Sequence, residues 1–231
     1  MNLLYRLSIR LREEGIWRTI KYIIKAWFYS FREFIYDTYM DLRYSGKLLH
    51  GNLKTSYKHL GAHDVFHTKY SVLLIIFKMV PIKKDDVLVD VGCGKGRVIN
   101  YWLSRKLKNR IVGLELDKVV AKHTASHLSK WKNVSIIQGD AIQNLPKDGT
   151  IFYIYNSFDK EIFEVLEKTM TTLFNNKPIT IVYYNPQSID VFRNGNWHIR
   201  YYNLEKDLGY KKWGRINKYH DLAILKNKVN G

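Results

Sequence analysis

The sequence predicts an α/β fold with a mostly parallel sheet, helices on both faces of that sheet, and a helical extension in front. From residue 87 onward, short apolar runs alternate with segments of helical period, as in successive β-α-β units. A glycine-rich turn follows the first apolar run, where such folds hold a nucleotide-like ligand. Residues 1–44 follow a helical period instead, with apolar and basic positions on different sides.

Length and composition favour one domain with an extension. The chain has 231 residues, and we place a basic amphipathic helical extension and loop at 1–69 and the α/β domain at 70–231. A net charge of +17 favours a polyanionic partner, the alternative being a solvated basic surface. The single cysteine excludes an internal disulfide, which fits a reducing cytoplasmic compartment. We see no signal peptide, and the apolar run 70–77 is far shorter than the roughly 20 residues that span a bilayer.

The extension is expected to form two helices separated at Gly15. Its apolar face is predicted at Leu4, Leu7, Leu11, Ile20, Ile23 or Ile24, Trp27, Phe31 and Phe34. The first 84 residues hold 15 Lys/Arg and 6 Asp/Glu, a net +9, so the basic excess is concentrated there. The default interpretation is packing on the domain or dimerisation through the aromatic face. Contact of residues 1–44 with an anionic membrane is the alternative, and nucleic acid is less favoured.

Residues 45–69 are expected to be loop and turn, followed by a core helix at 70–77. His59, His63 and His67 are spaced by four and could share a helical face that binds metal. Gly61 and the polar flanks weaken such a helix, and no carboxylate or cysteine completes the set. We therefore expect no metal site.

The α/β domain is predicted element by element from its periodicity. Strands are expected at 87–91, 110–116, 133–137, 150–155 and 178–184, with further strand-like segments at 197–202 and 220–225. Helices are expected at 98–103, 117–131 and 159–174, with Asp117 as the cap of the second. The last strand is expected to add antiparallel at an edge of the sheet.

The glycine turn excludes two common nucleotide sites. A P-loop needs Lys-Ser or Lys-Thr after its last glycine, but Lys95 is followed by Gly96. A dinucleotide fingerprint needs its third glycine at position 97, which is arginine. Glu115 ends the second strand, where a carboxylate can accept both hydroxyl hydrogens of a ribose. Lys95 and Arg97 are expected to be solvated or to add to a positive field on the substrate side.

Three motifs resemble those of class I S-adenosylmethionine-dependent methyltransferases. They are Asp90-Val-Gly-Cys-Gly-Lys-Gly96, Gly113-Leu-Glu-Leu-Asp117 and Gly139-Asp-Ala141, within a resemblance that covers about residues 82–225. The resemblance implies a Rossmann-like seven-stranded sheet whose last strand is inserted antiparallel. It also implies S-adenosyl-L-methionine as cofactor, with a glycine turn under its methionine part. The predicted cofactor-binding residues are Asp90, Gly92, Cys93, Gly94, Gly96, Glu115, Leu116, Asp140, Ala141 and Asn156.

Within that set the resemblance assigns individual roles. Asp90 corresponds to the acid that organises the loop and the amino group, and Glu115 to the ribose-binding acid. Asp140 and Ala141 correspond to the pair beside the adenine. Two alternatives come from the residues themselves: Asp90 as a cap of the turn, and Cys93 as a small packing residue.

The methyl acceptor is expected outside the carboxyl ends of the first and fourth strands. Asn156, in Tyr155-Asn-Ser-Phe158, partly resembles the asparagine element of amine and amide methyltransferases, and His67 is the candidate general base. We predict methyl transfer to a membrane-associated or polyanionic acceptor, such as a bacterial surface glycan or its lipid-linked precursor. Protein-lysine methylation, RNA methylation and a non-catalytic cofactor-binding scaffold are the alternatives. The protein is expected to be cytoplasmic or peripheral at the inner membrane face, with a homodimer left open.

Overall fold

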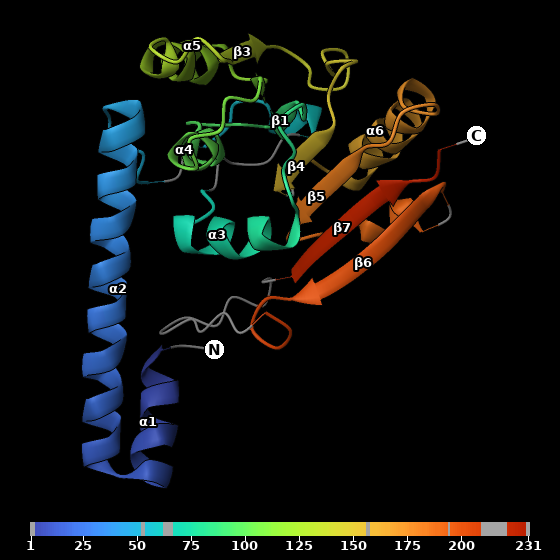
Figure 1. Cartoon of the computed structure of the whole chain (residues 1–231). Coiled ribbons are helices and arrows are strands. Elements are labelled where there is room, and N and C mark those ends of the chain that lie inside the picture. The colour runs from blue at the N-terminus through green and yellow to red at the C-terminus, as the bar shows by residue number, and fades with distance from the viewer. Residues whose placement is uncertain are drawn as a thin grey trace.

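In the computed structural model, helices cover both faces of a seven-stranded sheet, and a helical hairpin stands at one side of it (Figure 1). The structure describes residues 3–51, 54–61, 67–155, 158–193, 195–208 and 221–229. The α/β fold class and the N-terminal helices predicted from the sequence are confirmed.

The sheet has the strand order β3-β2-β1-β4-β5-β7-β6. Its strands are β1 Leu88–Val91, β2 Ile111–Glu115, β3 Val134–Gln138, β4 Ile151–Tyr155, β5 Thr180–Tyr184, β6 Trp197–Asn203 and β7 Asp221–Asn227. The first five strands run parallel, and β7 runs antiparallel to both of its neighbours. This order puts the carboxyl ends of β1 and β4 side by side in the middle of one edge of the sheet.

The edge position expected from the pattern of the tail is wrong, because β7 lies between β5 and β6, whereas the antiparallel insertion that the family resemblance implies is confirmed. Four consecutive β7 residues, 222–225, are buried, so this strand needs cover on both faces and a neighbour on both sides. Strand β6 has exposed positions at His198, Arg200 and Tyr201, which suits the outer place.

Two apolar cores form, one on each face of the sheet. On one face, α3 (Tyr70–Met79) and α4 (Arg97–Ser104) pack around Trp102, and α5 (Lys118–Leu128) adds its last residue. On the other face, α6 (Lys160–Leu173) and the 3-10 helix η2 (Ile189–Phe192) pack around Phe163, whose ring stacks on Tyr183 at 4.8 Å. The helix expected at 70–77 is therefore a core helix, as predicted.

The N-terminal hairpin consists of α1 (Leu3–Glu14) and the 30-residue α2 (Ile16–Ser45). They meet at Gly15, whose φ of 80° lies in the region that favours glycine, which confirms the predicted break. The C-terminal half of α2 contacts the domain, whereas its N-terminal half and α1 project past it (Figure 1). Another short 3-10 helix, η1, spans Lys58–Leu60 in the following loop.

Helix α2 packs on the domain, as the default interpretation expects, but not through its predicted apolar face. The exposed fraction is 66% for Trp27 and 48% for Phe31. The positions of α2 that face the domain are instead Asp37, Met40 and Asp41, which are buried. Among the described residues, no helix has the length and apolar character needed to cross a membrane.

Candidate active site

The glycine turn is held by the backbone of the neighbouring strand. The amides of Gly92 and Cys93 both donate to the Leu114 carbonyl at 2.9 Å, and the Gly96 amide donates to the Cys93 carbonyl at 2.8 Å. Gly92, Gly94 and Gly96 all have positive φ, so a side chain at these positions would be strained. The turn therefore brings the backbone close to the edge of the sheet, where a ligand can approach it.

Asp90 is a buried carboxyl with an unsatisfied oxygen. It lies between Gly113 on β2 and Tyr153 on β4 and is 2% exposed. Its Oδ2 atom has no hydrogen-bond partner among the described residues. Burial, with a smaller contribution from Glu115, raises the pKa of Asp90 well above its usual range. Since a buried acceptor without a donor is costly, this oxygen is suited to a hydrogen-bond donor from a ligand.

Glu115 links the glycine turn to the start of α5. Its Oε2 accepts from the Gly94 amide at 2.8 Å, and its Oε1 accepts from the Asp117 amide at 2.9 Å. Burial raises the pKa of Glu115, and the backbone N–H groups counteract part of this rise. Asp117 accepts in turn from the amides of Val119 and Val120, so the predicted cap of α5 is confirmed.

The third motif lies at the same edge of the sheet. The Gly139 amide donates to the Glu115 carbonyl at 2.9 Å, which joins the loops after β2 and β3. Asp140 is exposed and accepts from the Ile142 amide at 2.8 Å, while Ala141 is buried. Leu116 is half-buried, and its carbonyl accepts from Gln138. The structure thus brings the three motifs together along one edge.

Two of the predicted site residues, Asn156 and His67, belong to none of the three motifs. Asn156 is outside the described residues, although the neighbouring Phe158 packs on Phe163. The Nε2 atom of His67 donates to the Gly51 carbonyl at 3.0 Å. Burial, followed by the nearby charges of Arg97 and Lys95, lowers the pKa of His67 to about 4. His67 is therefore neutral near pH 7.

The predicted grouping of three histidines is not tested, because one of them lies outside the described residues. His59 is exposed and stacks on Tyr57, His67 turns toward Gly51, and His63 lies outside the described residues. No group of three metal-ligating side chains is found among the residues that the structure describes.

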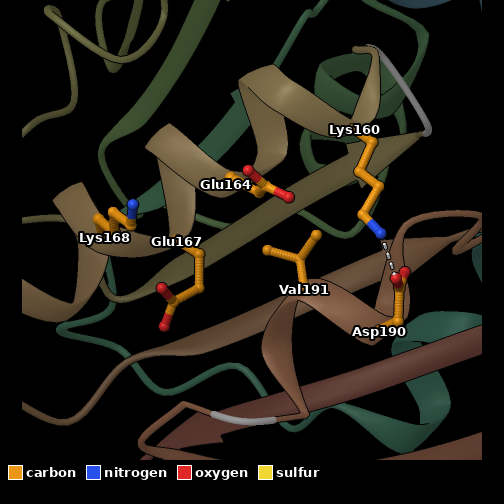
Figure 2. A pocket seen from close by; sticks show the side chains of 6 residues that line it. All are labelled: Lys160, Glu164, Glu167, Lys168, Asp190 and Val191. Carbon is orange, nitrogen blue, oxygen red and sulfur yellow. Dashed lines mark hydrogen bonds and ion pairs between the residues drawn. The ribbon is translucent and has the colours of Figure 1, made fainter.

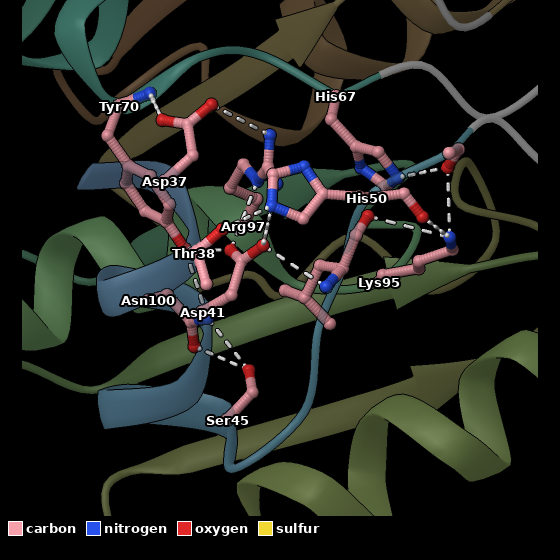
Figure 3. Close-up of polar contacts among 12 residues, drawn as sticks. Asp37, Thr38, Asp41, Ser45, His50, His67, Tyr70, Lys95, Arg97 and Asn100 are labelled. Atoms are coloured by element: carbon pink, nitrogen blue, oxygen red, sulfur yellow. Dashed lines mark hydrogen bonds and ion pairs between the residues drawn. The ribbon is translucent and has the colours of Figure 1, made fainter. Parts of the chain in front are cut away.

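A buried ion-pair network joins α2 to the start of α4, and the sequence-based analysis missed it (Figure 3). Arg97 Nη2 lies 2.7 Å from Asp41 Oδ2, and Arg97 Nη1 lies 3.5 Å from Asp37 Oδ2. The Tyr70 hydroxyl donates to Asp41 at 2.8 Å. Arg97 is 5% exposed, so its expected role as a solvated or substrate-facing cation is wrong.

Lys95 fixes the glycine turn to the segment after α2 (Figure 3). Its Nζ atom donates to the carbonyls of His50 at 3.0 Å and Gly51 at 2.9 Å. Burial, with the neighbouring Arg97 charge, lowers the pKa of Lys95. The expectation of a solvated Lys95 is wrong as well, since these carbonyls take up its hydrogen-bonding capacity. Together, Lys95 and Arg97 hold α2 and its following loop against the turn.

Cys93 packs tightly behind the turn. A Cβ atom on Gly113 would lie 2.8 Å from the Cys93 sulfur, so the two residues fit only because Gly113 has no side chain. Burial raises the pKa of the Cys93 thiol well above its usual range, which keeps it protonated and unreactive.

A separate pocket of about 270 Å³ lies between α6 and η2 (Figure 2). Acidic and basic side chains both line it, and Lys160 pairs with Asp190 at 2.7 Å. It is lined by Lys160, Glu164, Glu167, Lys168, Asp190 and Val191. None of the predicted cofactor or catalytic residues lines it, so we do not assign it to the transfer reaction.

Comparison with known proteins agrees with this geometry. Residues 88–176 match the family model of a methyltransferase domain. No curated protein shows significant sequence similarity to the chain. The matched domain, the sheet order and the three motifs together define a class I S-adenosylmethionine-dependent methyltransferase. The protein is thus a methyltransferase, and its cofactor is S-adenosylmethionine.

Solved structures share the fold at low sequence identity. An RNA methyltransferase from Salinibacter ruber, in complex with S-adenosyl-L-homocysteine, is 18% identical with a TM-score of 0.50, over 71% of this chain and 94% of that one. Precorrin-6y C5,15-methyltransferase from Geobacter metallireducens is 15% identical with a TM-score of 0.51, over 71% and 90%. Human N-acetylserotonin methyltransferase is 10% identical with a TM-score of 0.52, over 68% and 52%. These similarities establish the fold, not the acceptor.

Proposed function

We propose that this methyltransferase acts on a membrane-associated or polyanionic acceptor, such as a bacterial surface glycan or its lipid-linked precursor, at the cytoplasmic face of the membrane. One observation carries the proposal: a basic, aromatic helix is attached directly to the glycine turn. Arg97 and Lys95, on either side of Gly96, bind α2 and the loop that follows it. An acceptor that binds along α2 is therefore held in a fixed relation to the site of methyl transfer.

The residues at the edge of the sheet fit the cofactor. The unpartnered Oδ2 of Asp90 suits the amino group, and the positive-φ turn from Gly92 to Gly96 leaves room for the methionine part. The Glu115 carboxylate keeps lone pairs for the ribose hydroxyls besides its two amide contacts. We propose that Asp140 and Ala141 lie beside the adenine, as the family resemblance implies. When bound, the cofactor supplies an activated methyl group on a sulfonium.

The chain has to align the acceptor and, for a hydroxyl or ammonium, to remove a proton. We assign the proton acceptor role to His67, which is neutral and is oriented by its Nε2–H bond to Gly51, so that Nδ1 can accept. A pKa of about 4 makes it a weak base in the free protein. A negative charge on a bound acceptor would raise this pKa, so a polyanionic acceptor would strengthen the base. Asn156 is proposed to orient the acceptor.

Two other acceptor classes have specific support. The net charge of +17 favours RNA, a polyanion. The Asn156-Ser-Phe158 sequence favours a lysine side chain of a protein. We rank both below a membrane-associated acceptor, because neither accounts for the exposed aromatic side chains of α2.

The test is methyl transfer from tritiated S-adenosylmethionine to three fractions: envelope lipids and glycans, soluble protein, and RNA. We expect label in the envelope fraction, and none with the Glu115→Ala variant as the control for cofactor binding. Label in RNA or in protein alone would contradict the proposed acceptor. No label in any fraction, together with no calorimetric binding of the cofactor, would contradict catalysis by this chain.

A further inference from the structure

An apolar stripe on α2 is exposed to solvent; it begins on the part of the helix that projects past the domain (Figure 1) and ends at Phe34, whose ring stacks on His50 at 4.9 Å. We call it the α2 stripe, and it consists of Trp17, Ile20, Ile24, Trp27, Phe31 and Phe34. These residues recur every three or four positions and so lie on one side of the helix. Trp17 is 75% exposed and Trp27 is 66% exposed, and the Trp27 ring stacks on Phe31 at 5.4 Å.

Basic side chains flank this stripe, and only at the two ends of their row does an acid come close, with Glu14 near Arg18 and Glu33 next to Arg32. We call these basic side chains the basic row, and they are Arg18, Lys21, Lys25 and Arg32. At 100° per residue they fall together on the side of the helix next to the stripe. The segment 16–32 contains no Asp or Glu. The acids of α2 come later, where Glu33 pairs with Lys69, and Asp37 and Asp41 pair with Arg97.

The charge distribution argues against a second copy of the chain as the occupant of this face. Antiparallel pairing of two α2 stripes would bring the two basic rows to the same side, and segment 16–32 offers no carboxylate to neutralise either one. An anionic lipid surface suits this face better, because it attracts the basic row and accepts the aromatic rings.

We propose that the α2 stripe and the basic row dock on the headgroup region of an anionic lipid bilayer, with α2 lying in the plane of the surface. Tryptophan and phenylalanine would enter the boundary between headgroups and acyl chains, and Lys and Arg would contact lipid phosphates. This docking deepens the proposed function. It rests on that function in one respect: a membrane-bound acceptor requires the enzyme to bind the membrane.

The ion-pair network gives this docking a structural consequence. Asp37 and Asp41 stand on the same helix as the stripe and fix it to Arg97, the first residue of α4. A helix held in the bilayer plane therefore sets the distance and the tilt of the glycine turn relative to the lipid surface. The basic row also orients the helix, since its charges lie on one side of the stripe.

The experiment is flotation of the full-length protein with lipid vesicles in a sucrose gradient, without cofactor or acceptor. Vesicles of phosphatidylcholine alone are compared with vesicles that contain phosphatidylglycerol. We expect the protein to float with the anionic vesicles, and its bound fraction to fall with added salt. Because no methyl transfer is measured, a failure here is distinguishable from a failure of the proposed function.

Two double variants test the two parts of the surface. Lys21→Glu with Lys25→Glu should lower the partition coefficient on anionic vesicles by at least about tenfold. Trp27→Ser with Phe31→Ser should lower it by a similar factor, since burial of these rings is lost. The matched control is Lys118→Glu with Lys122→Glu, which makes the same charge change at exposed positions four residues apart on α5. This control should float nearly as well as the wild type.

Several results would overturn the proposal. The wild-type protein could stay at the bottom of the gradient, or it could float while neither α2 variant changes its bound fraction. The α5 control could also lose as much of its bound fraction as the α2 variants do. Light scattering on the same samples measures the oligomeric state. A dimeric wild type and a monomeric Trp27→Ser, Phe31→Ser variant, neither of which floats, would also overturn the proposal. That outcome would assign the stripe to a second copy of the chain. Thermal unfolding checks that each variant is folded.

Discussion

The buried Arg97 network provides the sharpest test of how α2 is attached. In the Arg97→Met variant the volume of the side chain is largely kept, but its charge and its hydrogen bonds are lost. Arg97 makes two contacts with Asp41, at 2.7 and 3.2 Å, and one with Asp37 at 3.5 Å. Both carboxylates would stay buried without their cation.

The expected loss is large, because breaking a buried ion pair from one side costs about 3–5 kcal/mol. That is a substantial part of the roughly 5–15 kcal/mol by which domains are stable. Removing the buried charge as well, with Arg97→Met and Asp41→Asn together, should recover at least about 1 kcal/mol, since the asparagine still accepts from Tyr70. The matched single variant is Arg110→Met, which breaks an exposed pair with Asp148 and should cost about 1 kcal/mol or less.

The loss should also depend on pH in a defined direction. Burial raises the pKa of Asp37, and the Arg97 charge offsets part of that rise. Without Arg97 the pKa of Asp37 rises further. A carboxyl with a raised pKa binds its proton more tightly in the folded state, so its stabilising contribution is present at low pH and is lost as pH rises through that pKa. The deficit of Arg97→Met should therefore be larger at pH 8 than at pH 4.5.

Urea unfolding, followed by tryptophan fluorescence at both pH values, measures these free energies. A deficit for Arg97→Met no larger than that of Arg110→Met would refute the claim that the network fixes α2. A deficit that shrinks with rising pH would refute the assignment of the effect to buried carboxyl groups.

Three further predictions concern the edge of the sheet. Glu115→Ala should raise the calorimetric Kd for S-adenosylmethionine by about 10- to 100-fold, because charge-assisted bonds to the ribose are lost, and an unchanged Kd would count against the assigned site. Asp90→Asn should weaken cofactor binding. Because burial raises the Asp90 pKa, the cofactor-free wild type should lose stability as the pH rises, and the variant should lack this loss. Equal pH slopes of stability for variant and wild type would contradict this. Gly113→Ala should lower stability by about 1–3 kcal/mol in thermal unfolding, because the new Cβ would lie 2.7 Å from Ile136 and 2.8 Å from the Cys93 sulfur; a neutral effect would show that these neighbours can move.

Much of the fold could be predicted because its strands are covered on both faces and read as apolar runs. The run predicted at 87–91 is β1 at Leu88–Val91, and the run at 150–155 is β4 at Ile151–Tyr155. The glycine turn was recognisable because its positive φ angles require glycine, and the three acids lie near the ends of β1, β2 and β3. These are local properties, and local sequence reports them well.

What could not be predicted depends on contacts between distant residues. Arg97 and Lys95 look like solvated cations in the sequence, since their partners lie 56 and 44 residues away. Asp37 and Asp41, four residues apart near the end of a mainly basic and aromatic helix, were the available signal for a buried partner. The exposure of the α2 stripe was equally hidden, because the same period describes a helix that packs on a core. The placement of β7 between β5 and β6 depends on strand pairing that its own residues do not encode, and only the family resemblance implied it.

The insertion of β7 also determines the order in which the sheet can be completed. Strand β6 is made before β7 but reaches the sheet only through it, so neither can take its place until residues 221–227 have been synthesised. Until then the open edge of β5 presents unpaired backbone groups beside apolar side chains, which is a site for intermolecular association. Cutting the chain before Asp221 would therefore remove the partner of a central strand, and aggregation of the fragment is the expected result.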